Sequence, residues 1–213
     1  MGSLHSALVA LTGVCVLIFV VAWIVGAVYF GSKSQAGLHG WVRGLRRTLP
    51  RRVLLMAGAY VFSTLVRHSH DFWRHLQYWQ PELALLGGLL VVSSTALLLW
   101  ARWVLGTMWA SVPTVQEHHE LRTDGPYQLV RHPIYTGLLG LIVGGMLACG
   151  FGVWIAFLAV AVPWLLHRVR VEDRLMAGQF AAAYDAYRTR VPALIPWTRP
   201  ARVGPHHADG EQQ

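Results

Sequence analysis

The feature that most constrains the fold of this chain is the gathering of its apolar residues into long blocks. Residues 4–30 contain no Asp, Glu, Lys or Arg over 27 positions, more than the roughly 20 residues that cross a bilayer as a helix. This block lacks a basic start and is too long for the apolar core of a secretory leader, so we interpret it as a retained membrane helix. With 54% hydrophobic and 13% charged residues among 213, the chain is predicted to be an all-α polytopic membrane protein.

The positions of these blocks predict about five membrane spans, at residues 8–30, 53–66, 82–103, 133–149 and 151–167. Only Gly150 separates the last two blocks, which indicates a tight helical hairpin. A polar helix rich in Ala and Arg is expected to follow as far as Arg190. We expect three units, namely N-terminal membrane helices, a cofactor-binding core with the hairpin and the C-terminal helix, and a flexible tail, over residues 1–104, 105–199 and 200–213.

Basic residues test this topology, because cytoplasmic loops of membrane proteins are enriched in Lys and Arg. Sixteen of the 18 Lys and Arg residues fall on one predicted side, and only Arg67 and Arg74 fall on the other. We therefore expect a cell-membrane protein with its N-terminus outside and its C-terminus and active site in the cytoplasm. The formal net charge of +8 lies beside the membrane spans, which argues against a nucleic-acid partner.

The polar stretch at residues 125–137, GPYQLVRHPIYTG, interrupts the apolar blocks. Pro133 disfavours helix at His132 and suits the first position of a new helix, so a loop should bring Arg131 and His132 to the mouth of that helix. The positive helix end there favours a carboxylate. Polar groups at this depth need partners and are commonly functional. The alternative is a turn with an interfacial arginine.

A second polar block follows at residues 168–173, RVRVED, with FAAAYDAY at 180–187 and VPALIP at 191–196. Arg168 and Glu172 are four residues apart and so share one helix face. Taken alone, they are equally compatible with an exposed interfacial salt bridge of small energetic value.

Together the two blocks resemble the isoprenylcysteine carboxyl methyltransferase family, which is related to the membrane phospholipid N-methyltransferases. That family reads G-x-Y-x-x-x-R-H-P-x-Y-x-G, then R-x-x-x-E-E, then F-G-x-x-Y-x-x-Y ahead of V-P-x-x-I-P. The first pattern is complete here, whereas Asp173 replaces the second glutamate and Ala181 replaces the glycine. The resemblance covers about residues 105–197. Asp173 keeps the charge with a shorter reach, so a role is carried over to it only weakly, and Ala181 is expected to reflect helix packing.

The resemblance implies S-adenosylmethionine as the cofactor and methyl transfer as the reaction. It assigns the cofactor site to Gln116, His119, Leu121, Tyr127, His132, Tyr135 and Glu172, and the catalytic roles to Arg131, Arg168 and Glu172. The implied acceptor is lipophilic and enters from the bilayer: an isoprenylcysteine-type carboxylate or thiol, or a lipid amine. A carboxylate or thiolate needs no strong base, whereas an amine must lose a proton, with Glu172 or His132 as candidate bases. The reaction requires no metal.

The acceptor pocket is expected to draw on the first three spans, where no motif matches. Candidates to line it are Trp103, Met108 and Trp109, with an interfacial aromatic belt as the alternative. His68, His70 and His75 are of a type that binds zinc, but they lie on the predicted outer side in no recognised pattern, so no metal site is predicted. Cys15 and Cys149 fall inside apolar spans and are interpreted as packing residues.

Two other functions remain open. A membrane NADPH-dependent reductase of the sterol-reductase type would need basic residues for the cofactor phosphates in the third loop. There, Arg122 is opposed by Glu117, Glu120 and Asp124, which disfavours this alternative. A non-catalytic membrane scaffold is the other alternative, and loss of the site residues would support it. Those residues are intact.

Overall fold

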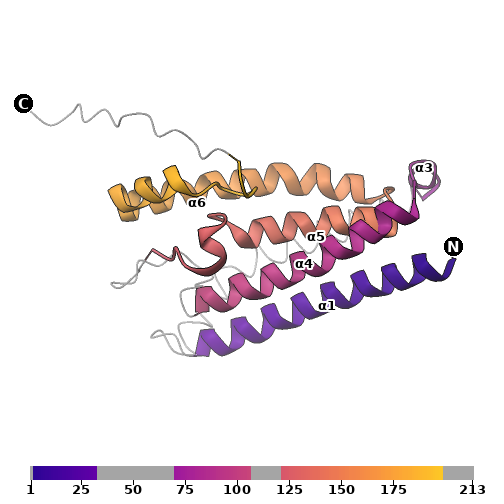
Figure 1. Ribbon diagram of the computed structural model, residues 1–213, viewed down its shortest axis with the longest axis horizontal. Coiled ribbons are helices and arrows are strands. Elements are labelled where there is room, and N and C mark those ends of the chain that lie inside the picture. Colours follow the sequence, from indigo (N-terminus) through magenta and orange to yellow (C-terminus); the bar gives the residue numbers. More distant parts are fainter. Residues whose placement is uncertain (1, 33–69, 107–120, 199–213) are drawn as a thin grey trace, which may run out of the picture.

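The computed structural model describes residues 2–32, 70–106 and 121–198, and every regular element within them is helical (Figure 1). The elements are α1 (Gly2–Ser32), α3 (His70–His75), α4 (Pro81–Leu105), the 3-10 turn η2 (Gly125–Gln128), α5 (Pro133–Cys149) and α6 (Trp154–Arg190). The four long helices lie side by side in Figure 1. The predicted all-α class is confirmed for these residues.

Within the described residues, three helical stretches are long and apolar enough to cross a membrane, namely Gly2–Tyr29, Pro81–Leu105 and Trp154–Arg190. Helix α5 is apolar but shorter, and it is joined to α6 by a short turn at Gly150, as the hairpin prediction required. The predicted span at 53–66 lies outside the described residues, so the count of five spans stays a prediction.

Glycine allows α4 and α5 to approach each other closely. A Cβ atom on Gly87 would lie 2.7 Å from the carbonyl oxygen of Gly144, and one on Gly137 would lie 2.6 Å from Cγ of Leu98. Small residues at a helix interface permit this packing in membranes, where van der Waals contact drives helix association. The close contact extends to the first turn of α5, and it therefore fixes the position of the loop that precedes this helix.

Helix α1 packs along α4 through a small apolar core. Cys15 is buried there together with Val91, Leu98 and Leu141. Both cysteines are free thiols, and the interpretation of Cys15 as a packing residue is confirmed. The opposite face of α1 exposes a run of large aliphatic side chains, as expected for a helix in contact with lipid.

Helix α6 contains a sharp corner at Ala181, whose backbone angles are φ 40° and ψ −119°. Asp173 and Tyr184 would be about 16 Å apart along a straight helix, yet their side chains are hydrogen-bonded, so the chain turns back here. These angles match the first central position of a type II′ turn, which usually holds glycine. The expectation that Ala181 reflects helix packing is therefore wrong, because the position is defined by its backbone conformation.

Candidate functional site

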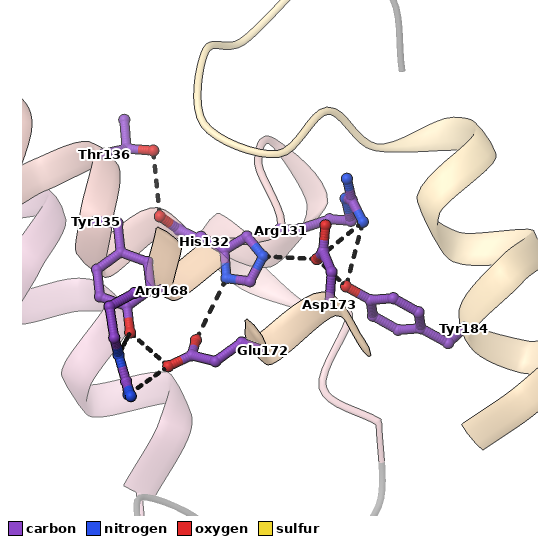
Figure 2. Close-up of polar contacts among 8 residues, drawn as sticks. All are labelled: Arg131, His132, Tyr135, Thr136, Arg168, Glu172, Asp173 and Tyr184. Atoms are coloured by element: carbon purple, nitrogen blue, oxygen red, sulfur yellow. Dashed lines mark hydrogen bonds and ion pairs between the residues drawn. The ribbon is translucent and has the colours of Figure 1, made fainter. Parts of the chain in front are cut away.

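The site forms where the loop before α5 meets the second half of α6, with His132 at its centre (Figure 2). The backbone of this loop is held by the segment that follows α6. The amide of Arg131 donates to the carbonyl oxygen of Pro192 at 2.8 Å, and the amide of His132 donates to that of Ala193 at 3.0 Å. Thr136 Oγ1 donates to the carbonyl oxygen of Leu194 at 2.6 Å. These three bonds form a clasp that fixes the orientation of the buried His132 side chain.

His132 lies between two carboxylates. Its Nε2 is 2.8 Å from Oδ1 of Asp173, and its Nδ1 is 3.6 Å from Oε2 of Glu172. Burial acts to lower the pKa of His132, but hydrogen bonds to Asp173 and Glu172, with the charges of both groups, outweigh burial and raise this pKa above its ordinary value. This environment favours the imidazolium form, in which both ring nitrogens carry protons. His132 is therefore placed as a donor and a positive charge.

The Glu172 half of the site is open to its surroundings. The hydroxyl of Tyr135 donates to Oε1 of Glu172, and Arg168 Nη2 donates to the same oxygen at 2.9 Å. The ring of Tyr135 stacks on that of His132, with centroids 5.8 Å apart and planes 27° apart. The side chain of Arg168 is 45% exposed and that of Glu172 is 31% exposed. A small molecule can therefore reach these groups.

The Asp173 half is more enclosed. Arg131 Nη1 donates to Oδ1 of Asp173 at 3.1 Å and to the hydroxyl of Tyr184 at 3.2 Å, and the Tyr184 hydroxyl donates to Asp173. The side chain of Arg131 is only 5% exposed. This buried arginine thus ties the loop to both arms of the corner in α6. These contacts make Arg131 a positioning residue for the loop. The catalytic role assigned to it from the resemblance stays a prediction.

The sequence analysis gave Asp173 only a weak role and gave none to Tyr184, Tyr187 or Thr136. The available signal was the F-x-x-x-Y-x-x-Y pattern, whose two tyrosines both help to hold the loop in place. The first of them binds Asp173, and the hydroxyl of Tyr187 donates to the carbonyl oxygen of Tyr127 at 2.6 Å. The shorter reach of Asp173 is sufficient, because Arg131, His132 and Tyr184 all converge on one of its oxygens.

Most of the predicted site residues come together. Figure 2 shows one connected cluster that contains Arg131, His132, Tyr135, Arg168 and Glu172.

The other predicted residues lie around this cluster or outside the described chain. Tyr127 is buried in η2, and its pKa is raised by burial first and then by Tyr187 and Glu172, so its phenol stays protonated near Glu172. Leu121 is half-buried ahead of η2. Gln116 and His119, like Met108, Trp109 and His68, lie outside the described residues, and their roles stay predictions. Over residues 2–32, 70–106 and 121–198, no group of three or more His, Cys, Asp or Glu is placed to hold a metal.

Fold and site together define a class: helical membrane proteins with a polar site at one end of the bundle, built from a loop arginine and histidine and from adjacent carboxylates on a later helix. Residues 85–178 match the model of the isoprenylcysteine carboxyl methyltransferase (ICMT) family. The chain belongs to this family, and it is a multi-pass membrane protein.

Relatives in the family have diverse names. The cobalt-zinc-cadmium resistance protein CzcN of Cupriavidus metallidurans is 33% identical over 171 residues, which cover 78% of this chain and 73% of the relative. Protein-S-isoprenylcysteine O-methyltransferase B of Arabidopsis thaliana is 36% identical over 83 residues, 38% of this chain and 42% of the relative. Methanethiol S-methyltransferase 1 of Bradyrhizobium diazoefficiens is 32% identical over 74 residues, 34% of this chain and 25% of the relative. The family therefore does not fix the acceptor.

Proposed function

We propose that this protein transfers a methyl group from S-adenosylmethionine to a lipophilic acceptor whose attacking oxygen or sulfur is already an anion. The observation that carries the proposal is the placement of His132 between Asp173 and Glu172, with one carboxylate oxygen facing each ring nitrogen. The raised pKa of His132 favours its protonated form, which has no free lone pair to accept a further proton. Each carboxylate in turn accepts hydrogen bonds from at least two donors.

The weakness of the proton acceptors in the site separates the candidate methyl acceptors. Burial acts to raise the pKa values of Glu172 and Asp173, but hydrogen bonds and the charge of His132 lower them overall, so both carboxylates are weak bases towards an ammonium group. A carboxylate or a thiolate attacks without losing a proton, so it needs no general base. Two relatives are named for these chemistries, one as an isoprenylcysteine O-methyltransferase and one as a methanethiol S-methyltransferase. The lipid amine is the less suited acceptor.

The chemistry of the donor set fits the cofactor. When bound, S-adenosylmethionine supplies an electrophilic methyl group on a sulfonium centre, together with an ammonium and a carboxylate group. Glu172 is accessible and can balance a positive charge, and Tyr135 holds Glu172 in position through its hydroxyl. Tyr127 in η2 stays neutral, because burial, Tyr187 and the charge of Glu172 raise its pKa.

Arg168 is the residue placed to bind the acceptor. Its guanidinium uses one N–H towards Glu172 and one towards Tyr135, the latter at 3.4 Å. A guanidinium carries further N–H donors in a planar fork that suits a carboxylate. An acceptor anion bound there would lie beside Glu172 and thus close to a cofactor whose positive charge Glu172 balances. The gain in rate comes from holding the attacking anion in line with the methyl group of the cofactor.

We also propose that the N-terminus is outside and that the site faces the cytoplasm, where a soluble cofactor is available. The support is the distribution of 16 of the 18 Lys and Arg residues on one side of the predicted topology. A reporter enzyme that folds only in the cytoplasm, fused to the C-terminus, is expected to be active. An inactive reporter, together with activity of a second C-terminal reporter that folds only outside the cytoplasm, would reverse the orientation.

The test of the cofactor is equilibrium binding of S-adenosylmethionine and, in parallel, of NADPH to the purified full-length chain. We expect S-adenosylmethionine to bind and Glu172→Gln to weaken it at least tenfold. The matched control is Glu82→Gln, which changes an exposed glutamate in the first turn of α4. Binding of NADPH alone would replace the proposal with a reductase. Binding of neither by the folded protein would favour a scaffold.

A further inference from the structure

A row of aromatic rings leads from the centre of the site towards an exposed tryptophan of α6. Tyr135 stacks on His132 and also meets Trp164 edge-on, with the Tyr135 and Trp164 centroids 6.5 Å apart and their planes 80° apart. The row begins at a buried imidazole and ends at an indole that is 52% exposed. The site is thus continuous with one exposed side chain in the apolar part of α6.

Trp164 and Arg168 lie at the boundary between two environments. They are four residues apart in α6 and therefore neighbours on one face. Residues 154–167 contain no Asp, Glu, Lys or Arg, and Arg168 is the first charged residue of the helix. A charge at this position marks the edge of the hydrocarbon region. An amphiphile with an anionic head matches this pair, because its head can meet the guanidinium while its chain stays in the apolar phase.

Building on the proposed function, we propose that Trp164 is a specificity-determining residue for the methyl acceptor. Its indole forms the apolar surface on which the hydrocarbon next to the acceptor's anionic atom packs, while Arg168 pairs with the anion. One helical turn, about 5.4 Å, separates the two groups along α6. The selected acceptor therefore carries its hydrocarbon within a few bonds of the charged atom. An acceptor as small as methanethiol would pair with Arg168 and leave the indole without contact.

A tryptophan near a membrane surface can also be a simple interfacial anchor, and the chain offers a matched example. For Trp103, the sequence leaves both pocket lining and an interfacial belt open, and its 81% exposure near the end of α4 favours the belt. This end of α4 packs against the glycine at the start of η2. Trp164 differs because its ring contacts Tyr135, whose hydroxyl binds Glu172. Trp103 therefore serves as the control for every measurement on Trp164.

The first test is photo-crosslinking of the full-length chain in lipid nanodiscs. The probes are a long-chain fatty carboxylate with a diazirine close to the carboxylate, and the methyl ester of the same molecule. We expect adducts of the carboxylate at Trp164 and its neighbours in α6 at several times the level found around Trp103. In Arg168→Gln, this labelling should fall to the level of the ester. Equal labelling at Trp164 and Trp103, or labelling that Arg168→Gln leaves unchanged, would overturn the proposal.

The second test separates acceptor recognition from cofactor binding. N-acetylcysteine thioethers with a long prenyl group and with a methyl group are compared as acceptors. Trp164→Leu is expected to raise KM for the prenyl compound about tenfold and to leave KM for the methyl compound and Kd for S-adenosylmethionine unchanged. Trp164→Phe should restore most of the preference, and Trp103→Leu should not alter it.

The two failures are distinguishable. An unchanged prenyl preference in Trp164→Leu, with S-adenosylmethionine still bound, would remove the role of Trp164 and leave the proposed function intact. If the folded wild-type chain bound no S-adenosylmethionine, the proposed function would fail, and the role of Trp164 would fail with it.

Discussion

Two neighbouring carboxylates divide the site into halves with different physical character. Glu172 and Asp173 are consecutive in α6 and both face His132, yet their arginine partners differ in exposure, 45% for Arg168 and 5% for Arg131. Interactions of exposed ion pairs are weak because water competes for them. Buried ion pairs become costly to break because a charge is left without its partner. The difference favours a binding role for the Glu172 half and a structural role for the Asp173 half.

The largest expected effect comes from breaking the enclosed half. Arg131→Met leaves Asp173 and Tyr184 without their shared donor, and removing one partner of a buried pair costs about 3–5 kcal/mol of folding free energy. Thermal unfolding in detergent measures the loss. The matched change in the open half, Arg168→Met, is expected to cost less than about 1 kcal/mol. Equal losses in the two variants would remove the distinction between the halves.

The next effect concerns the two tyrosines that bind the carboxylates. Tyr184→Phe removes a buried hydroxyl that bridges Asp173 and Arg131, and it should lower stability by about 1–3 kcal/mol. Tyr135→Phe removes the corresponding hydroxyl on Glu172, and we expect its main effect to be weaker binding of S-adenosylmethionine. Thermal unfolding and equilibrium binding of S-adenosylmethionine, measured on both variants, compare the two tyrosines. A stability loss for Tyr135→Phe as large as that for Tyr184→Phe would argue against it.

A smaller effect is expected from pH, because His132 joins the two halves. Its pKa in the folded protein is raised by the two carboxylates, so the imidazolium stabilises the fold. This contribution is fully present below the unfolded pKa of about 6.5 and is lost as the pH rises through the higher folded pKa. The unfolding temperature should fall over this range. In His132→Gln the fall should be absent, and if it persisted, another group would be responsible.

The smallest effect strengthens the enclosed half. Ala181→Gly should relieve the positive φ at the corner that brings Tyr184 to Asp173. The strain of a sparsely populated backbone conformation, about 1–3 kcal/mol, exceeds the entropy cost of glycine, about 0.5–1 kcal/mol, so a gain of roughly 0.5–1 kcal/mol is expected. The control is Ala177→Gly in the regular part of α6, which should destabilise by about 1 kcal/mol. Destabilisation by both changes would show that the corner is unstrained.

Much of the fold could be predicted because membrane spans follow from uninterrupted apolar blocks. The boundaries of α4 and α5 agree with those predictions within one or two residues, since proline marks the start of each helix. The two ordered motifs predicted that Arg131 and His132 would meet Arg168 and Glu172. The helical periodicity of each segment alone does not predict that these residues lie within bonding distance.

What the sequence did not reveal depends on the corner in α6. Alanine is a strong helix former, so nothing in the identity of Ala181 predicts a reversal of the chain. Without this reversal, the hydroxyl of Tyr184 could not reach Asp173, and that of Tyr187 could not reach the carbonyl oxygen of Tyr127. The sequence also did not predict the clasp on the loop, because its hydrogen-bond acceptors are main-chain carbonyl oxygens, which every residue has.

That clasp has a consequence for how the chain tolerates change. The bonds from Arg131 and His132 end on the backbone of Pro192 and Ala193, so the side chain at 193 takes no part in them and can be exchanged with little effect on the site. The length of the chain is a different matter. A version that stops at Arg190 keeps every side chain in Figure 2, yet it lacks the carbonyl groups that orient the loop. His132 would still be present, but its loop would no longer be held in the orientation that the site needs.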